Sequence, residues 1–201
     1  MQKQAASVLQ PHDADAASFR IKQETHCCTS QLHCPEYRTK FAADLKKMLP
    51  RLPLVSETAY IAFRDVRRKL AALHLNYETV DPWPLDEIGA AGGIDCRVTQ
   101  MRWAKDGKQV RKDMICYNPT LTLAGIPPEA YEYIVNGKSA LEWLMERYAV
   151  TTDKKSGIVK DPNLWCEEHK EPRYIIDLIK RIVRVSVETV DIVNGLPKLS
   201  E

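Results

Sequence analysis

Apolar residues recur every three or four positions in two stretches of the chain's first half, which predicts two amphipathic helices. The first helix is expected to begin at Pro35, since proline is tolerated in a first turn, and to end at Pro50. The second is expected to follow Ser56. Their apolar faces comprise Tyr37, Phe41, Leu45 and Met48 or Leu49 in the first helix, and Tyr60, Phe63, Val66, Leu70 and Leu73 in the second.

The spacing changes to strict alternation from Arg97 to Ala104, which is typical of a strand with one buried face. The turn that follows contains Asp106-Gly107, a strong signal for a β-hairpin. The return strand is expected at about 110–117, and a third short strand at 120–124. The acidic segment 76–93 contains proline and glycine and is interpreted as a connector.

The last third of the chain is predicted to be helical again. Two prolines open a helix over 129–135, and Asn136-Gly137 is interpreted as its stop. A capping box, Ser139 to Glu142, starts the next helix. A long loop, 151–172, precedes a strongly apolar helix over 174–193. These elements together predict an α+β fold, mainly helical with a small antiparallel sheet or hairpin.

Composition bounds the class of protein. The 201 residues are 44% apolar, which is enough for a core, and contain no apolar run of membrane-spanning length. No secretory signal is recognised, so a cytoplasmic location without membrane contact is expected. Residues 1–32 are polar and alanine-rich and are expected to be a disordered or atypical tail. Residues 33–201 are expected to form the domain, with a possible subdomain boundary near 76–96.

The net charge of +2 conceals three segments of strong local charge. Residues 34–75 hold nine basic and four acidic side chains, residues 76–96 hold five acidic and no basic ones, and residues 97–112 hold six basic and one acidic. Lysine and arginine supply most of the non-specific affinity for a phosphate backbone, so this distribution suits a DNA-binding face. It also suits ordinary solvated faces of long basic side chains.

Residue patterns that support catalysis or metal binding are weak. Residues 89–93 lack the lysine of a phosphate-binding loop, and Cys166 and His169 are spaced as chance alone would place them. The histidines and cysteines between His26 and Cys34 lack the ligand spacing of a zinc site. We therefore expect no catalytic residue, no metal and no cofactor.

Basic side chains in two regions are the best candidates for binding. In the hairpin they flank an exposed turn, and a two-stranded ribbon fits the major groove of B-DNA, where arginine or lysine can contact guanine. A charged edge hairpin protected from aggregation is the open alternative. The second region is the loop 151–172 and its flanks, with Lys160 and Trp165. The candidate DNA-binding residues are Arg102, Trp103, Lys105, Lys108, Arg111, Lys112, Lys138, Lys154, Lys155 and Arg173.

Four segments carry a family resemblance. They are HCPEYRTKFAADLKKMLPRLPLV at 33–55, LAALHLNYETVDPWPL at 70–85, MRWAKDGK at 101–108, and YNPTLTLAGIPPEAYEYIVNGKSALEWLMERY at 117–148. In this order they resemble the C-terminal specificity domain of the bacterial type ISP restriction-modification enzymes, and the similarity extends to Leu196.

The resemblance implies a target-recognition module that clamps double-stranded DNA together with an adenine N6-methyltransferase domain of the same enzyme system. It also implies a nuclease and a helicase-like motor upstream. The chain lacks the motifs of those domains, so a non-catalytic fragment or split subunit is expected. A structural domain that docks on the methyltransferase, without DNA contact of its own, is the alternative.

Overall fold

The computed structural model describes residues 34–47, 55–89 and 93–197. The expected tail, 1–32, and most of the histidine–cysteine cluster lie outside these residues. The chain divides into two compact units, one comprising Met1–Ala72 with Ile192–Glu201 and the other Leu73–Asp191. Each unit is described by itself, and the predicted domain limits stay a prediction.

Unit 1 contains the two predicted N-terminal helices, the first in two pieces. They are α2 (Pro35–Lys40), α3 (Ala42–Lys46) and α4 (Glu57–Leu75), whose final residues belong to unit 2. The predicted continuous helix is interrupted at Phe41, whose ring lies 4.9 Å from that of Tyr37. Tyr37 and Phe63 are completely buried and form the centre of a small core. The predicted end of the first helix, near Pro50, lies outside the described residues.

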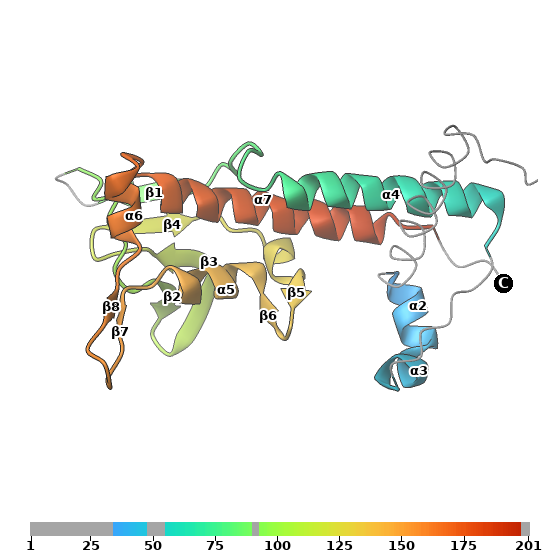
Figure 1. The fold of residues 1–201 in the computed structure, drawn as a ribbon, viewed down its shortest axis with the longest axis horizontal. Coiled ribbons are helices and arrows are strands. Elements are labelled where there is room, and N and C mark those ends of the chain that lie inside the picture. Colours follow the sequence, from blue (N-terminus) through green and yellow to red (C-terminus); the bar gives the residue numbers. More distant parts are fainter. Residues whose placement is uncertain (1–33, 48–54, 90–92, 198–201) are drawn as a thin grey trace, which may run out of the picture. The chain divides into compact units, whose positions relative to one another are not determined.

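Unit 2 is built on a four-stranded antiparallel sheet (Figure 1). Its strands, in spatial order, are β1 (Asp86–Gly89), β4 (Leu121–Ala124), β3 (Gln109–Cys116) and β2 (Arg102–Asp106). The predicted hairpin and third strand are confirmed, but the first hairpin strand begins at Arg102 rather than Arg97, and the turn is Gly107-Lys108. A row of paired residues crosses one face of the sheet, and its central members, Ile115 and Leu123, are fully buried. Paired residues share one side of a sheet, so the burial of Ile115 and Leu123 shows that this face turns toward the core.

Strand β1 was wrongly interpreted as part of a connector. Its sequence, Asp-Glu-Ile-Gly, is poor in residues that favour strands. It forms because all four residues pair with β4 and because Glu87 is bonded to Lys180 of α7 (Tyr174–Asn194) at 2.7 Å. Long-range contacts therefore override the local preference.

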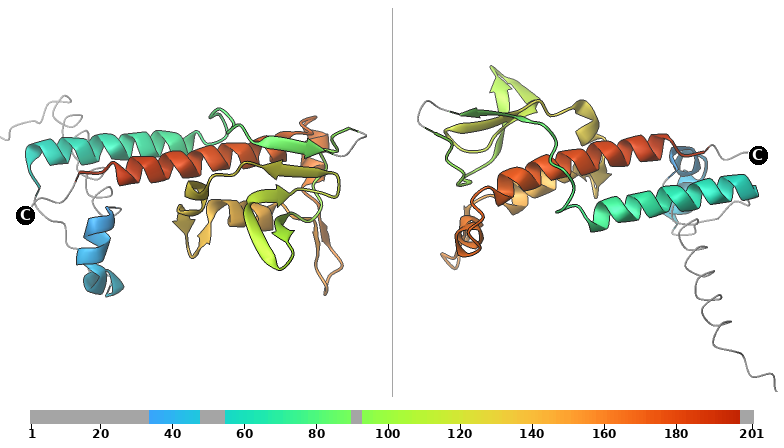
Figure 2. Two further views of the ribbon diagram at one scale, coloured as in Figure 1. Left: turned by 180° about the vertical axis from the view of Figure 1, so that it is seen from behind. Right: turned by 90° about the horizontal axis from the view of Figure 1, so that it is seen from above.

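Helix α7 supplies one side of the unit 2 core, and its predicted extent is confirmed. Ten of its residues are buried, among them Ile176, Ile179 and Val183 with no exposed surface. In the views of Figures 1 and 2 the helix runs along the sheet beside β1 and β4. The segment before β1 is fastened to α7, since Arg181 donates to the carbonyl oxygen of Val80 at 3.2 Å. That segment is therefore part of the packed unit.

The prediction of a helix over 129–135 is wrong. Only a single 3-10 turn, η1 (Pro128–Tyr131), is present, followed by a small hairpin of β5 (Ile134–Val135) and β6 (Lys138–Ser139). Asn136-Gly137 is its two-residue turn, with φ of 51° and 84°. Two consecutive positive φ values match the twist of a tight hairpin, and the same dipeptide also ends helices, so local sequence alone did not separate the two.

Helix α5 (Ala140–Arg147) confirms the predicted capping box. The backbone N–H of Glu142 donates to the Ser139 hydroxyl at 3.3 Å, and the Glu142 carboxylate accepts from the Ser139 N–H at 2.8 Å. Leu141, Leu144 and Met145 are the buried residues of this helix. These two reciprocal bonds satisfy two backbone N–H donors at the start of the helix.

The segment predicted as a loop, 151–172, contains two short strands and a helix, and the prediction is wrong in this respect. It forms a hairpin of β7 (Thr151–Thr152) and β8 (Val159–Lys160), then α6 (Asn163–Glu168). The hairpin turn is closed by Asp153, whose Oδ1 accepts from the Ser156 N–H at 2.8 Å and from the Lys155 N–H at 3.0 Å. Strands of two residues leave almost no periodic signal in a sequence.

Candidate nucleic-acid interface

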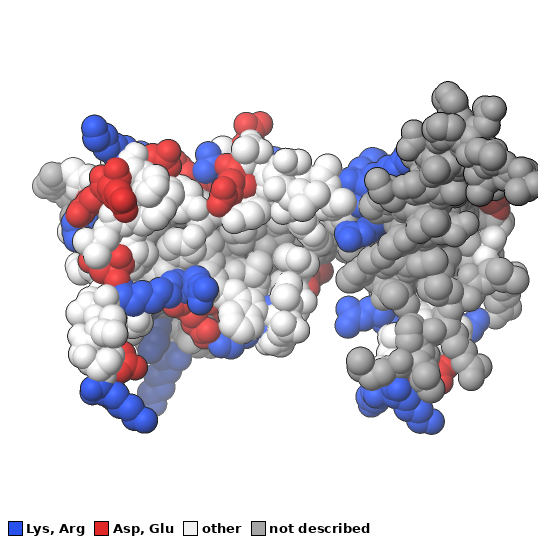
Figure 3. All heavy atoms as spheres, viewed as in Figure 1, with Lys and Arg blue, Asp and Glu red and all other residues white. Residues whose placement is uncertain are grey.

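Two hairpins, β2–β3 and β7–β8, extend from the same side of unit 2 (Figures 1 and 2). In Figure 3 lysine and arginine atoms gather where these hairpins end, whereas the surface between α7 and α5 is mostly uncharged. Eight of the ten candidate residues lie on these hairpins, whereas Lys138 lies in β6 and Arg173 directly before α7, and their surroundings differ strongly.

Lys105 lies near the end of β2 and Lys108 in the two-residue turn Gly107-Lys108, and both are exposed. Neither ammonium group has an ion pair or hydrogen bond among the described residues. Trp103, one position after Arg102, points the other way, toward the core, and its ring meets that of Tyr131 edge-on at 5.5 Å. The indole therefore anchors the hairpin, while the side chains of the two lysines are exposed to solvent.

Arg111 and Lys112, on the return strand, are compensated by carboxylates. The guanidinium of Arg111 donates to both oxygens of Asp113, at 2.5 and 3.2 Å, and this bonding lowers the pKa of the Asp113 carboxyl. Lys112 lies 3.3 Å from Glu142 and 5.4 Å from the centre of the Tyr131 ring. Both cations thus carry a counter-charge within the same unit.

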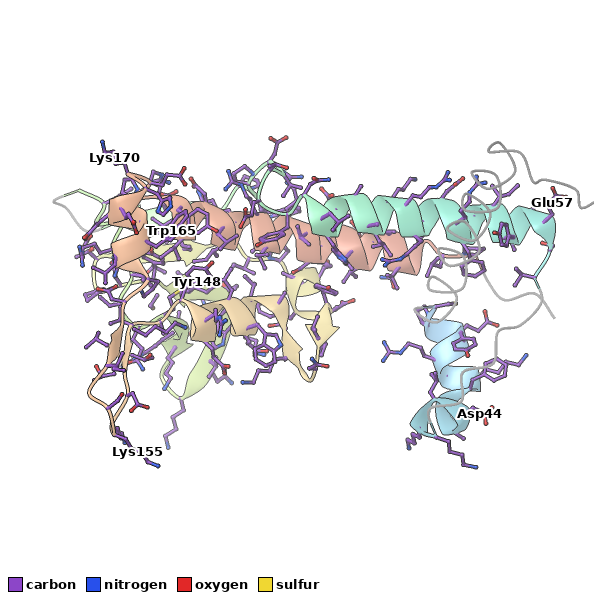
Figure 4. The ribbon with its side chains drawn as sticks, in the orientation of Figure 1. Asp44, Glu57, Tyr148, Lys155, Trp165 and Lys170 are labelled. Atoms are coloured by element: carbon purple, nitrogen blue, oxygen red, sulfur yellow. The ribbon has the colours of Figure 1, made fainter. Side chains whose placement is uncertain are left out.

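Lys154 and Lys155 lie in the turn between β7 and β8 and are exposed. Figure 4 shows Lys155 at the end of this hairpin, and Lys170 on the opposite side of the unit. Within the described ranges, the side chains of Lys154 and Lys155 have no acidic partner. Lys160, farther back in β8, instead donates to the carbonyl oxygen of Arg147 at 2.7 Å, close to the end of α5.

Lys138 and Arg173 are held within the domain. Lys138 pairs with Glu146 at 2.5 Å and lies over the Trp143 ring at 5.1 Å. Arg173 donates to Glu87 at 2.6 Å, and Lys180 donates to the same carboxylate. Burial opposes the ionisation of Glu87, but the bonds from Arg173 and Lys180 outweigh it and lower the pKa of the carboxyl. Arg173 therefore has a stabilising role in the fold.

A groove of about 620 Å³ between α5 and α7 was not identified in the sequence. Its aromatic walls come from the connector and from α5, and its apolar floor from α5 and α7. No periodic signal indicated it, because its residues are far apart in the chain. The aromatic and apolar lining residues include Tyr77, Trp143, Tyr148, Leu178 and Ile182.

The surroundings of Cys166 and His169 do not favour nucleophilic catalysis. Burial raises the pKa of the Cys166 thiol, which disfavours the nucleophilic thiolate. His169 stacks on Trp165 at 4.0 Å, with its Nδ1 2.9 Å from the Trp165 carbonyl oxygen. In the part of the chain that the structure describes, no group of three histidine, cysteine or acidic residues could hold a metal ion, and no helix could span a bilayer.

Comparison with solved structures finds the same fold in three complexes with DNA. A nuclease-deletion mutant of the Type ISP restriction-modification enzyme LlaGI, in complex with a DNA substrate mimic, is 39% identical with a TM-score of 0.75. The ATP-dependent Type ISP enzyme LlaBIII bound to DNA is 34% identical with a TM-score of 0.76, and the DrdV–DNA complex is 30% identical with a TM-score of 0.73. Each match covers 89% of this chain.

The chain spans only 16%, 11% and 18% of the lengths of those three proteins. No protein of curated function matches it. The family model of the Type ISP C-terminal specificity domain matches residues 26–178. That match, together with the shared fold, confirms the resemblance found in the sequence: the chain belongs to the family of Type ISP C-terminal specificity domains.

Proposed function

We propose that this chain binds double-stranded DNA and recognises its target sequence, without catalytic activity of its own. The observation that carries the proposal is the set of four exposed, uncompensated lysines at the ends of two hairpins on one side of unit 2. They are Lys105, Lys108, Lys154 and Lys155. The membership in a family of specificity domains, and the DNA in the complexes of LlaGI and LlaBIII, support the same proposal.

The chemistry of these lysines suits contact with phosphates. A lysine ammonium is a compact charge on a flexible stem and acts as a point contact, whereas base recognition requires a fixed geometry. Each phosphate that is neutralised releases counterions, which makes the logarithm of the binding constant fall with the logarithm of salt by about 0.9 per contact. Four contacts give a slope of about −3 to −4.

Titration of a labelled duplex with the full 201-residue chain, at salt from about 50 to 200 mM, tests the proposal. We expect replacement of the four hairpin lysines by glutamine to weaken binding and flatten the salt dependence. Lys170→Gln is the matched control, because Lys170 is an exposed lysine on the opposite side of the unit. Failure of the unaltered chain to bind at low salt, or a flat salt response, would contradict DNA binding.

The partner expected beside DNA, an adenine N6-methyltransferase domain of the same enzyme system, fits the groove between α5 and α7. Aromatic residues are typical of the centre of a protein interface, and the charged lining residues Glu146, Arg147 and Lys160 suit its polar rim. Trp143 is 42% and Tyr77 is 37% exposed, so both offer aromatic surface to a partner. The groove and the hairpin lysines involve different residues, so docking and DNA binding can be separated experimentally.

Substitution on each surface separates these two contacts. Charge reversal at the four hairpin lysines, Lys105, Lys108, Lys154 and Lys155, should abolish DNA binding and leave docking on the methyltransferase domain intact. Tyr77→Glu should weaken docking, measured by co-purification with that domain, and leave duplex binding unchanged. Loss of both contacts in either variant, in a protein that remains folded, would argue against separate surfaces.

A further inference from the structure

Sequence readout places stricter demands on a cation than phosphate contact does. Two parallel N–H donors of one arginine fit O6 and N7 of guanine, whereas lysine has no fixed fork. A reading side chain also has to be held by its neighbours on a rigid element, with its charge uncompensated. A reading residue therefore has to be an arginine, to be held in place on a rigid element, and to carry a charge that no carboxylate compensates.

Among the arginines of this region, Arg102 meets them. It is exposed, it lies at the start of β2, and its backbone is in register with Cys116 of β3. Its guanidinium donates one hydrogen bond, from Nη2, to Oε1 of Gln100, a neutral acceptor. Arg111 and Arg173, in contrast, are bonded to the carboxylates of Asp113 and Glu87.

The sheet places Arg102 on the face opposite the core. The register continues from Arg102 through Cys116 and Thr122 to Ile88, so these four side chains form one row across the sheet. The neighbouring row, which contains Ile115 and Leu123, is the buried one. Arg102 is thus the charged end of an otherwise uncharged row on the outer face of the sheet.

We propose that Arg102 reads a guanine of the target sequence in the major groove and that Gln100 is its positioning residue. This inference rests on the proposed function, and it divides the interface: Arg102 confers specificity, and the four hairpin lysines confer affinity. The remaining donors of the guanidinium contact O6 and N7 of the base. The amide oxygen of Gln100 fixes the plane of the guanidinium before DNA arrives, which reduces the entropy lost on binding.

A selection from duplexes with a randomised segment tests the inference, with the bound fraction sequenced and affinities measured for the preferred duplex and its single-base changes. The unaltered chain should select a guanine at one position, and replacing that guanine should weaken binding about tenfold. In Arg102→Ala that penalty should fall below about twofold, while the slope of the salt dependence changes by no more than about one.

Variants of Gln100 separate positioning from folding. Gln100→Ala should reduce the guanine preference several-fold with the unfolding temperature unchanged. Gln100→Glu places a carboxylate on the guanidinium, as Asp113 does for Arg111, and should therefore reduce both the affinity and the guanine preference. Arg147→Ala is the control, since Arg147 is an exposed arginine with no acidic partner in the described ranges and should leave the preference intact.

The outcomes distinguish this inference from the proposed function. An unaltered preference in Arg102→Ala overturns the inference and leaves DNA binding in place. Binding without any base preference in the unaltered chain overturns it as well. Absence of duplex binding under all salt conditions overturns both. A loss of guanine preference in Arg147→Ala equal to that in Arg102→Ala would also contradict the assignment.

Discussion

The side-chain amide of Asn163 pairs with both backbone groups of Val98. Its Oδ1 accepts from the Val98 N–H at 2.8 Å, and its Nδ2 donates to the Val98 carbonyl oxygen at 2.9 Å. Both residues are buried. The amide thus replaces the neighbouring strand that the backbone at Val98 lacks, and it fastens α6 to the segment that leads into β2.

Asn163→Ala should lower the free energy of unfolding by about 1–3 kcal/mol, because it leaves the buried N–H and C=O of Val98 without partners. Asn163→Asp should destabilise at least as strongly, since an acceptor oxygen would then face the Val98 carbonyl and Asp161. Urea denaturation followed by circular dichroism measures both. Gln109→Ala, at an exposed position, should stay within about 0.5 kcal/mol of the unaltered chain. Equal stability of Asn163→Ala and Gln109→Ala would contradict the role assigned to the amide.

Glu87 should make stability depend on pH through its bonds to Arg173 and Lys180. At neutral pH we expect Glu87→Gln to be less stable by about 1–3 kcal/mol, since hydrogen bonds to charged groups contribute this much. The pKa of Glu87 is lowered below its ordinary value of 4.5 in the folded chain. The stabilisation is therefore complete above the unfolded-state pKa and is lost as pH falls through the lower folded-state value.

Urea denaturation from pH 7 to about pH 3 checks the sign of this effect. The difference between the unaltered chain and Glu87→Gln should shrink below the unfolded-state pKa of the carboxyl. A difference that stays constant over this range would show that the charge of Glu87 is not what stabilises the sheet edge. Asp106→Asn, at the exposed end of β2, serves as a control for the loss of one carboxylate.

The capping box of α5 should account for part of the stability of unit 2. Ser139→Ala should cost about 1 kcal/mol, because it removes the acceptor for the Glu142 backbone N–H. Ser139→Thr retains the hydroxyl and should recover part of the loss. Thermal unfolding of the two variants checks the expectation, and a Ser139→Ala protein as stable as the unaltered chain would contradict it.

Strong local signals were predictable from the sequence, and pairings between distant segments were not. The Ser139–Glu142 box and the long apolar run of α7 are local features, and both are confirmed. Strand β1 is formed from poor strand residues that β4 and Lys180 hold in place, so its sequence could not indicate it. The small β5–β6 hairpin shares its Asn-Gly signal with a helix stop, and only the partner strand decides between them.

The same limit applies to the candidate interface. Lys154 and Arg173 are equivalent in a count of charges, but only the fold brings Arg173 to Glu87 and leaves Lys154 in solvent. Gln100 was not identified, because its relevance comes from the side-chain bond to Arg102. Whether a cation is compensated depends on tertiary contacts, and a sequence pattern of basic residues does not contain that information.

The pairing of Arg111 with Asp113 yields a prediction in which a substitution strengthens binding. Asp113→Asn removes the carboxylate that holds the guanidinium and removes a negative charge beside the β2–β3 hairpin. Arg111 should then become available to a phosphate. Under the proposed function, duplex affinity should rise at low salt, and the slope of the salt dependence should become steeper by up to about one.

The double variant Asp113→Asn with Arg111→Gln isolates the cause. If released Arg111 contacts DNA, the second substitution should cancel most of the gain in affinity. If the gain came only from removing a negative charge near the phosphates, Asp106→Asn, which removes an exposed carboxylate of the same hairpin without releasing Arg111, should raise the affinity equally. Because both side chains are exposed and bonded to each other, neither change should alter the unfolding temperature appreciably, which makes affinity the deciding measurement.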